Sequence, residues 1–351
     1  MKLFADETGK FQMFIPINWE YKNPSFYKNT TAPESFGEYT KMSGAFQVSC
    51  KEVTKHISKL ISDNNLKIHT YNDVELHFDE KVVRQKDLIS YMWMAAVENH
   101  FILATYIVTP IKKVYFFKYK KELKSVRKAL SSIRFVKPEH RNIVISQKRF
   151  SLFMASIATT IQLRNNSIKH KSFIEFIALS ANHIDALLRL SIIYNNQIIE
   201  NNKEIDTTLL FQKEGDKPIM EKDIYKKALE EKIITQELYD KLFSLYNERN
   251  KVIHRYIITD IRTEDLFEIA VEYDKIDHKI DELVNDLECK QFELKVGIFC
   301  TDSPSNGSLN GQELEKLQYQ IRDKHGKIKI SNSTNQLWRI YKLIESALKR
   351  S

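Results

Sequence analysis

The spacing of apolar residues changes once along this chain, and this change constrains the fold more than any other feature. Through about residue 137, short segments such as 11–16 and 101–108 alternate in polarity or are apolar over the length of a strand. From about residue 148, apolar side chains recur with the period of an α-helix. The sequence therefore predicts an α+β protein, with an N-terminal antiparallel sheet and flanking helices followed by an all-α bundle.

This pattern divides the chain into three segments. Residues 1–137 form the predicted α+β domain, and the proline-containing stretch 138–142 is expected to be a linker. Residues 146–290 carry the apolar stripes of a bundle of about four to five helices. Residues 291–351 form a C-terminal extension in which Lys and Arg outnumber Asp and Glu.

Composition excludes several classes of protein. The net charge of +8 mildly favours a polyanionic partner. No stretch approaches about 18 uninterrupted apolar residues, so we expect no membrane-spanning helix. The three cysteines form no CxxC pair, which fits a reducing cytoplasm. There is no phosphate-binding glycine loop, and the ten histidines show no metal-ligand spacing, so we expect no cofactor and no metal.

One motif points to a chemistry. Residues 245–256 have the sequence LYNERNKVIHRY, which places Arg249, Asn250, His254 and Tyr256 at the end of a strongly helical segment. A histidine can take a proton from a ribose 2′-hydroxyl, and an arginine can hold a phosphate as negative charge builds on it. Because RNA carries its own nucleophile, such a pair is a minimal toolkit for cleaving RNA without a metal-bound water.

The motif has to be weighed against chance. Arg134 with His140 and Arg164 with His170 have similar spacings but lack the rest of the pattern. The full pattern, with Asn directly after Arg and Tyr two residues after His, is expected by chance in on the order of one chain per thousand. Arg249 falls on the apolar stripe of its helix, and His254 follows about 140° around that helix. A long arginine side chain, a helix irregularity or a second subunit must therefore close the gap between them.

Residues 146–290, with this motif in a late helix, resemble the HEPN superfamily, especially the HepT-like toxins with their R-x-x-x-x-H-x-Y signature. The resemblance implies a usually dimeric, often metal-independent ribonuclease of toxin–antitoxin, antiviral or RNA-processing systems. It also implies that Arg249 and His254 are the catalytic pair and that Asn250 is the polar residue following the arginine. Tyr256 would match the tyrosine that a partner nucleotidyltransferase modifies. Some members of the superfamily are inactive scaffolds.

The N-terminal segment carries a second resemblance. Residues 11–19 have the pattern F-x-x-x-I-P-x-x-W, and the strand 44–49 and the segment 132–135 add to it. Together they resemble the PsbP-like fold shared with a Ran-binding family. Such domains are usually non-catalytic, so the resemblance implies a binding or sensor module.

Two further features have competing explanations. His183 lies beside acidic and amide groups on a predicted helix, where it either lines the same cleft as the motif or is a half-buried structural histidine. The basic cluster at 118–128 fits a solvated helix face as well as RNA binding.

We therefore expect a cytoplasmic endoribonuclease acting on RNA, a toxin or antiviral effector. It is expected to work as a homodimer formed through the bundle, with an antitoxin or nucleotidyltransferase as a candidate partner and no membrane. The alternative is a non-catalytic HEPN scaffold that binds RNA or protein.

Overall fold

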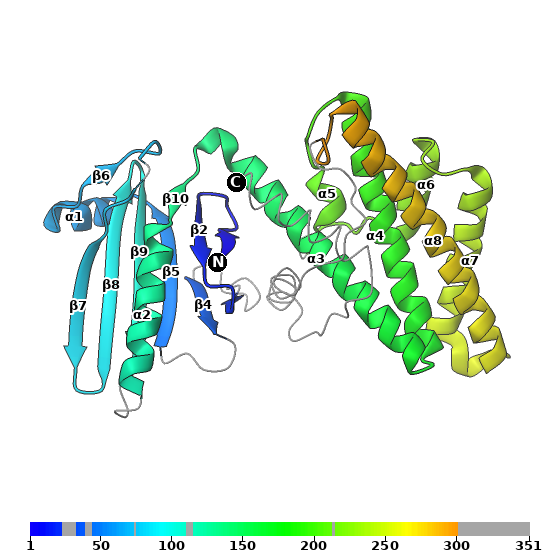
Figure 1. Cartoon of the computed structure of the whole chain (residues 1–351), viewed down its shortest axis with the longest axis horizontal. Helices are drawn as coiled ribbons and strands as arrows, with labels where there is room; N and C mark the ends of the chain where they lie inside the picture. Colours follow the sequence, from blue (N-terminus) through cyan, green and yellow to red (C-terminus); the bar gives the residue numbers. More distant parts are fainter. Residues whose placement is uncertain (23–32, 39–43, 74, 110–114, 213–214, 301–351) are drawn as a thin grey trace. The chain divides into compact units, whose positions relative to one another are not determined.

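The computed structural model describes residues 1–22, 33–38, 44–73, 75–109, 115–212 and 215–300. Strands are confined to the first part of the chain and helices dominate the rest, which confirms the predicted α+β class. The chain divides into two compact units after Ile145. We describe each by itself, as the N-terminal unit and the helical unit (Figure 1).

The N-terminal unit contains two sheets. A three-stranded sheet has the order β1-β2-β10, and a seven-stranded sheet has the order β3-β4-β5-β9-β8-β6, with β7 paired to β8. All neighbours are antiparallel except β6 and β8, which are parallel. The elements are β1 (Lys2–Ala5), β2 (Phe11–Ile15), β3 (Trp19–Lys22), β4 (Glu34–Glu38), β5 (Gly44–Glu52), α1 (Lys55–Asp63), β6 (Ile68–His69), β7 (Asp79–Gln85), β8 (Leu88–Val97), β9 (His100–Val108), α2 (Tyr115–Ser131) and β10 (Arg134–Phe135).

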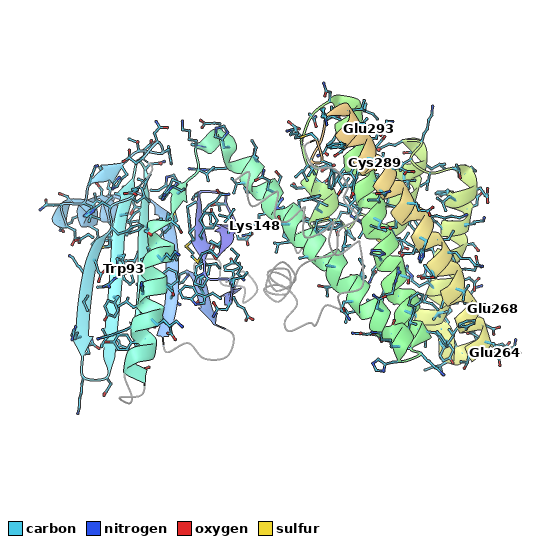
Figure 2. All side chains as sticks on the ribbon, in the orientation of Figure 1. Trp93, Lys148, Glu264, Glu268, Cys289 and Glu293 are labelled. Atoms are coloured by element: carbon cyan, nitrogen blue, oxygen red, sulfur yellow. The ribbon has the colours of Figure 1, made fainter. Side chains whose placement is uncertain are left out.

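Helix α2 covers one face of the larger sheet (Figure 1). Apolar side chains of α2, including Leu123 and Val126, are buried against residues of β5, β8 and β9. The Tyr106 hydroxyl donates a hydrogen bond of 2.6 Å to Glu122, so the acidic residue within α2 points inward. Trp93 on β8 donates through its indole nitrogen to Glu80 at 2.7 Å (Figure 2). The exposed side of α2 is therefore left to its basic residues.

The stretch just before the helical unit is helical and not an irregular linker. The expected linker at 138–142 is wrong, because Pro138–His140 form a 3₁₀ turn (η2) that leads directly into α3. Proline at the first position of a helical turn loses no hydrogen bond, so it starts the segment here instead of breaking it. The elements of this unit are α3 (Arg141–Lys169), α4 (Phe173–Glu200), α5 (Thr207–Leu210), α6 (Glu221–Glu230), α7 (Gln236–Arg255), the 3₁₀ turn η3 (Tyr256–Ile258) and α8 (Thr263–Leu294).

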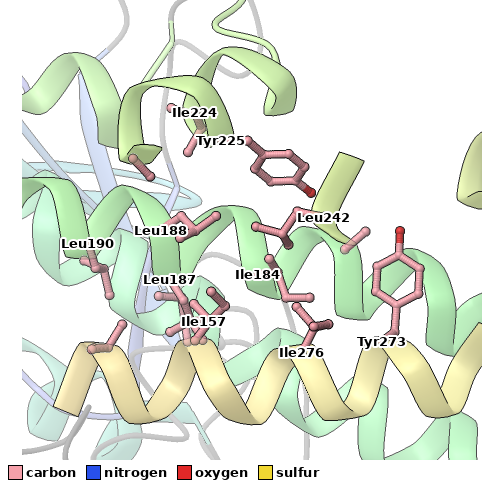
Figure 3. Close-up of a cluster of buried hydrophobic side chains, with 14 of the residues drawn as sticks. Ile157, Ile184, Leu187, Leu188, Leu190, Ile224, Tyr225, Leu242, Tyr273 and Ile276 are labelled. Carbon is pink, nitrogen blue, oxygen red and sulfur yellow. The ribbon is translucent and has the colours of Figure 1, made fainter. Parts of the chain in front are cut away.

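Helix α4 lies at the centre of the helical unit. Its apolar side chains pack with residues of α3, α6, α7 and α8, and Figure 3 shows Ile184, Leu188, Leu242 and Ile276 within this cluster. Among the residues described, α4 is the one helix long and apolar enough to cross a membrane, with a mean hydropathy of 1.4. Because 67% of the most apolar 18-residue segment of α4 is buried in the bundle, the helix has the character of the core helix of a soluble protein.

The bundle continues past residue 290, where the extension was expected to begin. Gln291 on α8 is buried and donates to the Tyr194 carbonyl at 3.1 Å and to Gln197 Oε1 at 2.9 Å. Phe299 is also buried, and it packs edge-on against Tyr194. Residues 301–351, most of the expected C-terminal extension, lie outside the described residues.

Candidate functional site

The R-N-x-x-x-H-x-Y motif occupies the last turns of α7 and the start of η3. The helix begins where the sequence indicated, with the Thr235 hydroxyl accepting from the Leu238 amide at 3.3 Å. The predicted stripe of Leu242, Leu245 and Val252 is buried. The Tyr273 hydroxyl donates to the Leu245 carbonyl at 2.8 Å and holds α7 against α8. Arg249 thus enters a well-packed helix face.

Arg249 is held by three neighbours. Its Nη1 pairs with Glu221 Oε2 at 2.5 Å, and its Nη2 donates to Asn250 Oδ1 at 3.1 Å. The guanidinium lies over the ring of Tyr246, 4.9 Å from its centre. The side chain is only 15% exposed, and Nε is buried without a hydrogen-bond partner among the described residues. An isolated positive charge on the apolar face of a helix would be unfavourable. The Glu221 carboxylate neutralises the charge of Arg249 within the chain.

The partner of Arg249 belongs to a cluster that sequence reasoning missed. This acidic–basic cluster consists of Asp185 and Arg189 on α4, Glu221 on α6, and Arg249 and Asn250 on α7. Asp185 Oδ2 pairs with Arg189 Nε at 2.8 Å, so each guanidinium has a carboxylate. A usable signal was Asp185 four residues before Arg189, on a helix that is otherwise strongly apolar.

Burial dominates the electrostatics of this cluster. It raises the pKa of Glu221, although Tyr225 and Arg249 act in the opposite direction. Burial likewise raises the pKa of Asp185 above its ordinary value, against the influence of Arg189 and Arg249. The ionised form of both carboxylates is thus less stable than that of a carboxylate in water. An anion that bound Arg249 would displace a Glu221 carboxylate whose charge is only partly stabilised by its surroundings.

His254 lies elsewhere on the same helix. Its side chain is exposed, as are those of Ile253 and Arg255. The helix runs through Arg255, so five residues place His254 about 140° from Arg249. No hydrogen bond between described residues links these two side chains. A single chain therefore brings Arg249 and Asn250 together but leaves His254 apart.

Tyr256 begins the 3₁₀ turn that follows α7. Its side chain is half-buried and packs against the core of the helical unit. The Thr259 hydroxyl donates to its carbonyl at 3.5 Å. The next two residues, Ile257 and Ile258, are 95% and 81% exposed. The motif therefore ends in an apolar surface.

His183 belongs to a different cluster, inside the bundle. Its Nδ1 lies 2.6 Å from Asp277 Oδ1, and Arg164 forms an ion pair with the same carboxylate. His183 is 1% exposed, which agrees with the structural alternative and not with a place in an open cleft beside His254. Arg164 lies within α3. It continues a stripe through Ile157 and Ile161, a spacing that could have revealed its inward direction.

Among the described residues, no group of three or more His, Cys, Asp and Glu side chains is placed to hold a metal ion. No disulfide joins the three cysteines, of which Cys300 is buried and Cys50 and Cys289 are half-buried.

Comparisons with known proteins leave the family open. No family model matches the chain, and no curated protein matches it. A crystal structure from Bacteroides thetaiotaomicron VPI-5482 is 12% identical, covers 53% of this chain and 76% of its own, and has a TM-score of 0.29. The solution structure of CyanoP, the cyanobacterial PsbP from Synechocystis sp. PCC 6803, is 9% identical, covers 38% and 93%, and has a TM-score of 0.22. Neither structure is similar enough to assign a fold or a family to this chain. The HEPN resemblance of residues 146–290 and the PsbP-like resemblance of the N-terminal segment therefore remain predictions.

Proposed function

We propose that the helical unit is a metal-independent endoribonuclease of the HEPN type. The observation that carries the proposal is the arrangement at the end of α7. There, an arginine and an asparagine in contact precede an exposed histidine at the motif's spacing. A toxin or antiviral role in the cytoplasm, with an antitoxin or nucleotidyltransferase as partner, extends this proposal.

The proposed reaction uses the ribose 2′-hydroxyl as nucleophile. His254 accepts the hydroxyl proton while the 2′-oxygen bonds to phosphorus, and the bond from phosphorus to the 5′-oxygen breaks. A second histidine donates a proton to that leaving oxygen. Arg249 binds the scissile phosphate in place of the Glu221 carboxylate and is positioned by Asn250. The products are a 2′,3′-cyclic phosphate and a 5′-hydroxyl.

The test is direct. The purified chain should cleave RNA in the presence of EDTA, and mass spectrometry should find a 2′,3′-cyclic phosphate. DNA of the same sequence should remain intact, because it lacks the nucleophile. Cleavage that stops in EDTA, or equal cleavage of DNA, would overturn the proposal.

The second histidine requires a second subunit. We propose that two chains associate through the end of the bundle that carries the motif, around a two-fold axis. Four large apolar side chains are exposed there: Ile253, Ile257, Ile258 and Phe267. Glu264 and Glu268, exposed on the first turns of α8, provide a polar rim (Figure 2). An isologous contact at this surface places two copies of His254 near one another.

Replacing Ile257 and Ile258 by aspartate should convert the dimer to a monomer, because two charges would be buried in each half of the contact. Light scattering at micromolar concentration measures the mass. Ile199→Asp, at a 70% exposed position on α4, is the control and should stay dimeric. A wild-type chain that is strictly monomeric would refute the proposed assembly.

Tyr256 is the proposed site of regulation. A partner nucleotidyltransferase would add nucleotide phosphates two residues from His254 and place negative charge where the RNA phosphate must bind. The Tyr256→Phe variant should still inhibit growth but escape neutralisation by the partner. The control variant Tyr239→Phe, at a half-buried position on α7, should be neutralised normally. Normal neutralisation of Tyr256→Phe would show that this tyrosine is not the target.

One observation favours the alternative, a non-catalytic scaffold. The Arg249 guanidinium is already paired with Glu221, as in a structural ion pair. A scaffold of this kind would bind RNA or protein and leave every RNA in a broad cellular panel uncut.

A further inference from the structure

The exposed side of α2 is strongly basic over residues 119–131, the part whose side chains are described. Lys120, Lys121, Lys124, Arg127 and Lys128 are all exposed. At 100° per residue these positions fall within an arc of about 120°. The one acidic residue of the helix, Glu122, is buried and accepts from Tyr106.

Three of these charges have no local compensation. Arg127 is paired with Glu80 at 2.5 Å, which neutralises it. Among the described residues, no carboxylate forms an ion pair with Lys121, Lys124 or Lys128. These three lysines are spread over about two turns of one rigid helix, a spacing of roughly 10 Å from first to last. They form a short row of positive charge on a fixed support.

Over residues 119–131, the part of α2 whose side chains are described, the basic face carries no exposed apolar side chain. The apolar side chains of α2 that the structure describes, including Tyr119, Leu123 and Leu130, are buried in the core of the N-terminal unit. A helix that lies on a membrane inserts apolar side chains beside its basic ones, and a protein interface has a desolvated apolar centre. The row of lysines on this described part of α2 fits a partner whose own surface is a repeating row of charge, as in the phosphates of a nucleic acid.

We propose that the basic face of α2 is a docking surface for the phosphate backbone of single-stranded RNA. It would recruit RNA without reading its sequence, because lysine–phosphate contacts carry no base information. The inference rests on the proposed RNA substrate of the helical unit.

The experiment measures binding apart from cleavage. All variants are made in the full chain carrying His254→Ala, so that RNA is retained. The probe is a fluorescent single-stranded RNA of mixed sequence, and its anisotropy is followed over a range of salt concentrations. The test variant carries Lys121→Glu, Lys124→Glu and Lys128→Glu. The matched control carries Lys55→Glu, Lys59→Glu and Lys67→Glu, three exposed lysines on and after α1 with the same change in net charge.

The test variant should bind RNA at least roughly tenfold more weakly than the chain with native lysines. The magnitude of the slope of log affinity against log salt should also fall by about two, because each of the lost phosphate contacts contributes roughly 0.7 to it. The control should keep nearly all of its affinity. Equal losses in both variants would show an effect of net charge alone and overturn the proposal. Unchanged RNA binding in the test variant overturns the proposal too. Binding to phosphatidylserine vesicles is measured in parallel, and a variant that loses only vesicle binding would show that the face binds membranes and not RNA. Circular dichroism establishes that both variants are folded, and cleavage by the chain with native His254 tests the nuclease separately.

Discussion

Replacing His254 by alanine should reduce RNA cleavage by about 10²–10⁴-fold, because the reaction loses its general base or acid. Arg249→Ala should cause a comparable loss, since the negative charge that builds on the phosphate loses its partner. The rate is measured under single-turnover conditions in EDTA, with RNA in the range where the wild-type rate is saturated. The loss should therefore appear in the chemical step and not only in binding.

Exposure of the side chains makes the His254 variant the cleaner of the two. His254 is exposed, so its removal should leave the fold unchanged. Arg249→Ala leaves Glu221 without its ion-pair partner, and thermal unfolding must accompany the rate. His56→Ala, an exposed histidine on α1, is the matched control and should cleave at the wild-type rate. A folded His254→Ala variant that cleaves as fast as wild type would move the chain to the scaffold function.

Replacing Asp277 by asparagine should destabilise the helical unit by about 3 kcal/mol, because it removes the buried carboxylate of Arg164 and leaves only the more exposed Asp274, at 3.7 Å, to pair with the guanidinium. Asparagine offers one oxygen and one NH₂ group, so either His183 Nδ1 or the Arg164 guanidinium then faces a donor instead of an acceptor. Urea unfolding followed by circular dichroism measures the change. Asp286→Asn, an exposed position on the same helix, should change stability by less than about 0.5 kcal/mol. A similarly small effect at Asp277 would mean that the ion pair contributes little.

The same carboxylate predicts how stability depends on pH. Burial alone would raise the pKa of Asp277, but His183 and Arg164 together hold it below its ordinary value. The folded state therefore binds this proton more weakly than the unfolded chain. The stabilisation is complete above the unfolded pKa of about 3.9 and is lost as pH falls from there through the lower folded value. Glu221 and Asp185, whose pKa values are raised, act oppositely and favour the folded state as acidification first protonates them. In the Asp277→Asn variant, the loss of stability at the lowest pH should be smaller.

The fold was largely predictable because it depends on local periodicity. The strand at Phe11–Ile15, the Thr235 cap and the stripe through Leu242 and Leu245 follow from residue spacing alone. Failures occurred where tertiary pairing overrides a local signal. Ser49 and Glu52 form a capping pattern, yet β5 continues to Glu52 because β9 pairs with it residue by residue. The helix instead starts after Thr54, which caps it.

The candidate site was predictable only in part. Spacing along α7 identifies Arg249, Asn250 and His254, because all three belong to one segment. It does not identify Glu221, which lies 28 residues away and meets Arg249 only when α6 folds against α7. The sequence left two alternatives open for His183 for the same reason, since Asp277 and Arg164 come from two other helices. Partners across a bundle leave no periodic signal in a single sequence.

The packing of α4 on α8 has a consequence for synthesis of the chain. Contacts between His183 and Asp277, and between Gln197 and Gln291, each join residues 94 positions apart and run in the same direction along both helices. The apolar surface of α4 therefore leaves the ribosome well before the helix that covers it exists. Closing so long a loop slows folding and prolongs the exposure of that surface. Until α8 is made, we expect this surface of α4 to bind chaperones.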